Sequence, residues 1–150
     1  MSPSSRLAAL GLSLPAVAAP VAAYVPAVRS GSYVFSSGQL PFRDGSLPVT
    51  GLVGSEVSLE DAAACARLCA LNALAAVDGV VPLDQLRVVK VVGFVASAPG
   101  FDGQASVVNG ASELLQDVFG EPHARSAVGV AALPLRAPVE VELIAEVVGE

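Results

Sequence analysis

The sequence predicts an α+β domain, and three observations support this prediction. Residues 59–78 and 104–119 carry apolar residues at helical spacing, and a glycine follows each segment. Residues 86–95 are an almost continuous apolar run, which is typical of a central strand covered on both faces. Val-rich segments near both ends of the chain are broken by turn residues, so strands able to pair as antiparallel hairpins are expected there. The expected order is β-β-α-β-α-β-β, with two helices able to cover one face of the sheet.

At the N-terminus, residues 1–21 are predicted to form an arm with one short helix, Ser5–Gly11, capped by Ser4 or Ser5. The uncharged run Leu7–Ala23 has some features of a secretory leader. Pro15 and Pro20 interrupt this run and little positive charge precedes it, so neither a spanning helix nor a leader is expected. A cleaved leader is the less favoured alternative, and the rest of the arm is expected to be extended.

The next segments are predicted to form a hairpin and then a long loop. Tyr24–Arg29 and Tyr33–Gln39 are the expected strands, and Ser30–Ser32 supplies the turn between them. Residues 40–57 are rich in Gly and Pro and are expected to form a loop, with a tight turn at Arg43–Gly45.

The first long helix has clear sequence signals at both ends. Ser58 is the expected N-cap, with an acidic residue three positions later, and Gly79 ends the helix. Asn72 is the one polar residue near the apolar face and is expected to hydrogen-bond neighbouring backbone. Cys65 and Cys69 share that face but have no further Cys or His partners, so they are expected to be small buried hydrophobes rather than zinc ligands. The face is made of small residues that allow close approach to a sheet: Ala62, Cys65, Ala66, Cys69, Ala73 and Ala76.

The last third of the chain is predicted to contain two strands, in residues 124–130 and 139–145, separated by a turn bounded by prolines. Arg125 opens the first strand and Glu140 begins the second, so two charges lie at the ends of apolar strands, where an ion needs a partner or a ligand. An arginine fork can hold a carboxylate in two hydrogen bonds, and a nearby glutamate can orient or deprotonate a water. The alternative is a salt bridge between Arg125 and Glu140 that satisfies both charges.

Length, charge and composition restrict the function classes. A chain of 150 residues is expected to form one domain, 1–150, around a single core. The net charge of −6 and the single lysine, Lys90, argue against a nucleic-acid partner. The many small apolar residues indicate that part of the surface is an oligomer interface. The sequence contains no glycine-rich phosphate loop and no metal-ligand cluster, so no metal is expected, and His123 is interpreted as a loop histidine.

Four short motifs in the same order resemble those of one family. They are Ala124-Arg125-Ser126 with the Leu133-Pro134 turn and the Val139–Ala145 strand, Tyr24-Val25 ahead of Ser36–Pro41, Asn72, and Phe94-Val95 before Val108-Asn109. Together they resemble the RidA/YjgF family, also called the endoribonuclease L-PSP family, over about residues 22–147. The resemblance implies a chorismate-mutase-like fold, with two helices on one face of a mixed, mainly antiparallel sheet. It also implies a cytoplasmic homotrimer without a cofactor or membrane contact, whose ligand clefts lie at the subunit boundaries.

The family resemblance implies hydrolytic deamination of reactive enamines and imines to 2-oxo acids and ammonia. By that resemblance, Arg125 is expected to hold the substrate carboxylate and Glu140 to position the attacking water. A protonated imine is already electrophilic, so orientation and electrostatic support suffice without a covalent nucleophile. The alternative is a non-catalytic module that binds a small carboxylate in the same cleft. The RNase activity in the family's older name is less favoured because the chain is acidic.

The same resemblance assigns the residues that line the cleft. Tyr24 is expected to contribute from the neighbouring subunit, and Ser37 and Gly38 to lie close to the ligand. Asn109 is expected to support the cleft rather than to take part in the chemistry. Ala127 stands where many members have cysteine, so a role for that thiol is absent and the pocket is slightly larger. Pro26 stands where a polar residue is common, and the N-terminal arm is longer than in the best-known members. These departures indicate a divergent subgroup and leave the physiological imine unassigned.

Overall fold

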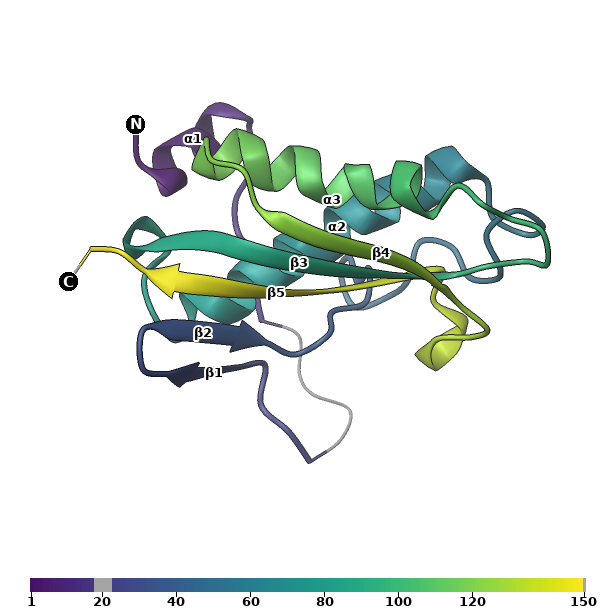
Figure 1. Ribbon diagram of the computed structural model, residues 1–150, viewed down its shortest axis with the longest axis horizontal. Helices are drawn as coiled ribbons and strands as arrows, with labels where there is room; N and C mark the ends of the chain where they lie inside the picture. Colours follow the sequence, from purple (N-terminus) through teal and green to yellow (C-terminus); the bar gives the residue numbers. More distant parts are fainter. Residues whose placement is uncertain (18–22, 150) are drawn as a thin grey trace.

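Two long helices lie on one face of a five-stranded mixed sheet (Figure 1). The computed structural model describes residues 1–17 and 23–149. The sheet order is β1-β2-β5-β3-β4, in which only β3 and β4 run parallel. The predicted α+β class and the mainly antiparallel sheet are therefore confirmed. The elements of the sheet and its two covering helices are β1 Ala27–Ser30, β2 Tyr33–Ser36, α2 Leu59–Asp78, β3 Leu86–Ala96, α3 Gln104–Phe119, β4 Ala124–Val130 and β5 Val139–Val147.

The expected hairpin at the C-terminus is wrong, because β4 and β5 lie on opposite sides of β3. Helix α3 connects β3 to β4 as a crossover, and such a connection makes the two strands parallel. Strand β5 then pairs antiparallel with the other edge of β3 and also with β2. Strand β5 thereby joins the N-terminal hairpin to β3.

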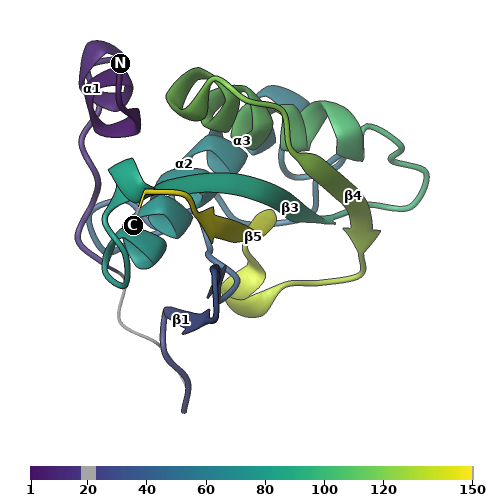
Figure 2. The ribbon, with the colours of Figure 1, turned by 60° about the vertical axis from the view of Figure 1, so that its left-hand side comes forward.

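The N-terminal helix begins earlier than predicted. Helix α1 is Pro3–Ala9, because Ser2 is its N-cap and a proline is favourable in the first turn. The amide and hydroxyl of Ser4 both donate to the carboxylate of Asp84, at 2.7 Å each, and Leu7 is buried. The Ser4 contacts tie α1 to the segment before β3, and α1 also lies beside the end of α3 (Figure 2). The last part of the predicted arm, residues 18–22, lies outside the described residues. No helix of the described chain is both long and apolar enough to cross a membrane.

The first hairpin forms with shorter strands than predicted, and Gly31 supplies its left-handed turn. The predicted tight turn after it is confirmed: Arg43 and Ser46 exchange backbone hydrogen bonds, and Asp44 takes a positive φ of 52°. Asp tolerates this conformation better than most side chains. Both features lie where the turn residues of the sequence indicate.

Helix α2 has the predicted bounds, and the Ser58 side chain accepts from the Asp61 amide as its N-cap. Cys65 and Cys69 are free and buried, as the sequence predicts. Burial raises the pKa of the Cys65 thiol to about 11, with a further contribution from the charge of Asp61. Burial also raises the pKa of Cys69, so both thiols stay protonated and unreactive near neutral pH. They act as small apolar residues in the core.

Asn72 fastens the loop after β2 to helix α2. Its side-chain nitrogen donates to the carbonyl oxygens of Leu40, at 3.0 Å, and Phe42, at 3.1 Å. Asn72 is 5% exposed, so both bonds lie where water does not compete. The predicted role in binding neighbouring backbone is confirmed, and the bonds fix the chain just beyond Gly38 and Gln39.

We expect Asn72→Ala to lower the free energy of unfolding by about 2 kcal/mol, because two carbonyl groups lose their buried donor. Urea unfolding at a fixed protomer concentration measures the change. Gln116→Ala is the matched control, since Gln116 is an exposed amide on α3 and its loss should change stability by less than about 0.5 kcal/mol. Equal effects of the two substitutions would contradict the assigned role.

Candidate functional site

Arg125 lies on the side of β4 that faces the helices. It is in register with Val91 of β3, which in turn pairs with Leu143 of β5, and both of those residues are buried beneath the helices. Its Nη1 donates to Oδ1 of Asn109 at 2.7 Å and to Oγ of Ser112 at 3.3 Å. Both partners lie on α3, so the helix holds one corner of the guanidinium.

The remainder of the Arg125 guanidinium is available. Its Nε and Nη2 make no hydrogen bond or ion pair with the residues that the structure describes, and the residue is half-buried. A planar guanidinium with two adjacent free donors matches the two oxygens of a carboxylate. Ala127, two residues further along β4, lies on the same face and leaves the space beside the fork open.

Glu140 lies on the opposite face of the sheet from Arg125. It is in register with Phe94 of β3, and its neighbours in sequence, Val139 and Val141, are fully buried against the helices. Because side chains alternate along a strand, Glu140 points to the face that no helix covers. The predicted meeting of Arg125 and Glu140, as a joint site or as a salt bridge, therefore does not occur within one chain.

The carboxylate of Glu140 packs against Gly38. A Cβ at position 38 would lie 2.8 Å from Cδ and Oε1 of Glu140, so only glycine permits this approach. Burial raises the pKa of Glu140, and the like charge of Glu142 adds to the shift. Among the described residues the carboxylate has no ion pair.

Ser37 holds the segment that carries Tyr24 beside Gly38. The Ser37 hydroxyl donates to the carbonyl of Val25 at 2.6 Å, and its amide donates to the carbonyl of Pro26 at 2.8 Å. The Tyr24 side chain is 45% exposed. The structure thus brings Tyr24, Ser37 and Gly38 to the Glu140 side of the molecule, away from the Arg125 fork.

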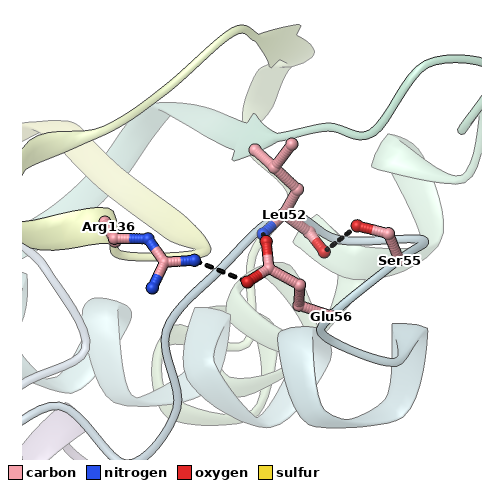
Figure 3. A network of polar contacts seen from close by, with 4 residues as sticks. All are labelled: Leu52, Ser55, Glu56 and Arg136. Atoms are coloured by element: carbon pink, nitrogen blue, oxygen red, sulfur yellow. Dashed lines mark hydrogen bonds and ion pairs between the residues drawn. The ribbon is translucent and has the colours of Figure 1, made fainter.

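A polar network fixes the loop that leads into Glu140 (Figure 3). Arg136 forms an ion pair with Oε2 of Glu56, and Oε1 of Glu56 accepts from the Leu52 amide at 3.2 Å. These interactions lower the pKa of Glu56, the Leu52 hydrogen bond first and the Arg136 contact second. Leu135 and Arg136 both take a φ of 58°, a conformation that non-glycine residues rarely adopt without support. The network supports this turn and so sets where β5 begins.

The predicted residues therefore form two groups on one chain. The arginine group consists of Arg125, Asn109 and Ala127, to which the structure adds Ser112 and His123; the ring Nε2 of His123 lies 3.0 Å from the Ser112 hydroxyl. The glutamate group consists of Glu140, Gly38, Ser37 and Tyr24. Helical spacing from Asn109 and strand spacing from Arg125 are the signals that could have indicated Ser112 and His123.

No set of three or more His, Cys, Asp or Glu residues that could hold a metal occurs in the described part of the chain.

Comparisons with known proteins agree on the family. The sequence profile described as "Endoribonuclease L-PSP" matches residues 15–147. Protein TCP17 of Trypanosoma cruzi is 45% identical over 148 residues, covering 95% of this chain and 92% of that protein. A proposed endoribonuclease from Shewanella oneidensis has a TM-score of 0.94 and 32% identity, covering 98% of this chain and 100% of that one. TdcF of E. coli, solved with bound serine, has a TM-score of 0.66 and 28% identity, covering 89% and 94% of the two chains.

Proposed function

The chain belongs to the endoribonuclease L-PSP family, and from this premise we propose that it hydrolyses small enamines and imines that carry a carboxylate. Arg125 binds the carboxylate, and Glu140 of a neighbouring subunit positions the water. The free donors of Arg125 are the observation that supports the proposal most, because they form a fork beside α3 without a partner in the described chain. Their geometry suits a carboxylate better than a single acceptor atom.

The two groups support a simple reaction. The carboxylate of a protonated imine binds the arginine group, which orients the C=N carbon. The Glu140 carboxylate accepts a proton from water while the water oxygen forms a bond to that carbon. The C=N electron pair moves to the nitrogen as that bond forms, which gives a carbinolamine, and the proton passes from Glu140 to this nitrogen. Glu140 then takes the hydroxyl proton as the C–N bond breaks, so ammonia leaves and the 2-oxo acid forms, and Glu140 returns its proton to solvent. A raised pKa makes Glu140 a stronger base than an exposed carboxylate, so it suits this exchange.

The opposite faces of Arg125 and Glu140 support a site shared between subunits. The face that carries Glu140 also exposes apolar side chains that no helix covers, and such a surface is typical of a subunit interface. In the proposed homotrimer this face meets its copies, and the glutamate group of one subunit approaches the arginine group of the next. The apolar residues of this face are Val28, Tyr33, Phe35, Phe94, Val128 and Ile144.

The second candidate is a non-catalytic module that binds a small carboxylate with the same Arg125 fork. The serine bound to the related TdcF is likewise a small molecule that carries a carboxylate, which favours this candidate. Pyruvate would then stabilise the protein against heat without turnover of 2-iminopropionate, and Glu140→Gln would leave binding unchanged. A wild-type rate of imine loss equal to background would overturn the hydrolase proposal and leave this candidate. RNA cleavage, suggested by the family name, is opposed by the net charge of −6.

A mixed-oligomer experiment tests whether the site is shared. Arg125→Ala and Glu140→Gln are co-expressed with different affinity tags, and oligomers that contain both are isolated by two successive purifications. We expect each variant alone to be inactive toward 2-iminopropionate, which an amino-acid oxidase generates in the assay. Each mixed trimer has one interface with both side chains intact, whichever variant supplies two subunits, so about a third of wild-type activity should return.

Two further preparations make the mixed-oligomer result decisive. Oligomers that mix the double variant with Arg125→Ala contain no intact interface and should stay inactive. When wild type is mixed with the double variant, each trimer with two wild-type subunits contains one intact interface, so this preparation should be active. Mixed single-variant oligomers as inactive as their parents would overturn the shared site.

A further inference from the structure

His123 is the only histidine of the chain, and it contacts the arginine group at a defined atom. Its Nε2 lies 3.0 Å from Oγ of Ser112, the same oxygen that accepts from Nη1 of Arg125 at 3.3 Å. The imidazole Nε2 and the guanidinium Nη1 therefore both contact one oxygen, Oγ of Ser112. Neither Ser112 nor His123 is among the residues that the family resemblance assigns to the cleft.

Arg125 sets the direction of one of these hydrogen bonds. A guanidinium only donates, so Oγ of Ser112 accepts from it. The neutral ring can contact the same oxygen in either tautomer: an Nε2 without a hydrogen accepts from the Ser112 hydroxyl, and an Nε2 with a hydrogen donates to its second lone pair. In the protonated ring Nε2 donates, and Ser112 accepts two hydrogen bonds, which its two lone pairs permit. The ring thus keeps its contact in both charge states.

The charged groups around His123 come from three elements. Arg125 approaches from β4, Arg87 from β3 and Glu121 from the preceding loop, while α3 contributes the uncharged Ser112. Arg87 and Glu121 line a pocket of about 330 Å³ together with His123, and their nearest charged atoms are 3.9 Å apart. Burial lowers the pKa of His123, and the positive charge of Arg125 lowers it further.

We propose that His123 is a positioning residue that holds the Arg125 fork through Ser112 and makes carboxylate binding at Arg125 depend on the charge of the imidazole. This inference rests on the proposed role of Arg125 as the carboxylate clamp. A carboxylate bound to Arg125 cancels part of the positive charge that opposes protonation of His123. Binding therefore favours uptake of a proton by the ring, and by reciprocity a protonated ring favours binding. Affinity for a carboxylate rises as the pH falls through the pKa of His123.

The first test reads the ring directly and does not depend on activity. With a single histidine, long-range ¹H–¹⁵N spectra of the ¹⁵N-labelled protein report one imidazole. We expect Ser112→Ala to change the nitrogen shifts of the ring, because Nε2 then loses its hydrogen-bond partner. Saturating pyruvate should raise the pKa of His123, and Arg125→Gln should raise it without ligand. Ring nitrogen shifts that Ser112→Ala leaves unchanged, or a pKa of His123 unmoved by pyruvate, would overturn the inference.

The second test measures pyruvate affinity by calorimetry from pH 5 to pH 8. The wild type should bind about fivefold more tightly below the pKa of His123 than above it. This is the size expected for a carboxylate and a nearby imidazolium in partly screened surroundings. His123→Gln places an amide nitrogen where Nε2 lies, so it should bind pyruvate without this step. His123→Leu should bind more weakly than His123→Gln at every pH, because it cannot contact Ser112.

Protonation of Glu140 can also strengthen binding at low pH, so the same titrations are made on a Glu140→Gln background. The step that belongs to His123 should persist there and disappear only when His123 is replaced. A wild-type protein that binds pyruvate with no step assigned to His123 overturns this inference alone. A wild-type protein that binds no pyruvate overturns the inference together with the proposed clamp.

Discussion

Arg125→Ala is expected to lower kcat/KM for hydrolysis of 2-iminopropionate by about a thousandfold while the protein keeps its fold and oligomeric state. Two charge-assisted hydrogen bonds to the substrate carboxylate are lost, and together they contribute about 4 kcal/mol to the transition state. The fold should survive because the lost bonds to Asn109 and Ser112 lie at a partly exposed edge of the sheet.

The assay couples an amino-acid oxidase to trapping of the remaining imine, and scattering checks the oligomeric state. Arg67→Ala is the matched control, because Arg67 is a partly exposed arginine of α2 that belongs to neither group of the site. Arg125→Lys should recover only part of the rate, since an ammonium cannot present two parallel donors. A variant Arg125→Ala with unchanged kcat/KM would show that another group binds the carboxylate.

The two long helices could be predicted because their signals are local. Ser58, Gly79 and Gly120 mark helix ends through caps that act over three or four residues. The order of the strands could not be predicted in this way, because which edge of β3 receives β5 is decided by distant pairing. Sequence adjacency favoured a hairpin of β4 with β5, whereas in the structure β5 pairs with β3 and β2.

The site was predicted as a set of residues but not as an arrangement. Arg125 and Glu140 each stand near the start of a strand, which suggested that they meet. Their faces depend on the register of both strands against β3, where Val91 faces the helices and Phe94 does not. A shift of one residue in either register would turn Arg125 or Glu140 to the opposite face of the sheet. No local pattern in an apolar strand specifies the register. The role of Ser112 was not predicted, because a serine inside a helix carries no distinctive signal beyond its spacing from Asn109.

Close contact between the helices and the sheet depends on glycines as well as on the alanine-rich face of α2. A Cβ at Gly93 of β3 would lie 2.4 Å from Cγ2 of Val108, so α3 approaches the sheet over a missing side chain. Gly110 of α3 is more restrictive, since a Cβ there would lie 2.0 Å from the carbonyl oxygen of Ala63 in α2. A flexible side chain could move away, but a backbone carbonyl inside a helix moves only with its helix.

Gly110→Ala is therefore expected to lower the free energy of unfolding by about 3 kcal/mol, although alanine is the better helix former by about 1 kcal/mol. The added methyl group must separate α2 from α3, which also disturbs the packing beneath Asn109 and Arg125. Urea unfolding at a fixed protomer concentration measures the loss.

Gly79→Ala is the matched control for Gly110→Ala. Gly79 has a φ of −65° at the end of α2, and a Cβ there would meet its nearest atom at an ordinary 3.4 Å. Alanine should therefore be neutral or slightly stabilising at position 79, because it restricts the unfolded chain without strain in the folded one. If Gly110→Ala were as stable as Gly79→Ala, the helices would have room to separate, and the tight crossing would not be what holds α3 against the sheet.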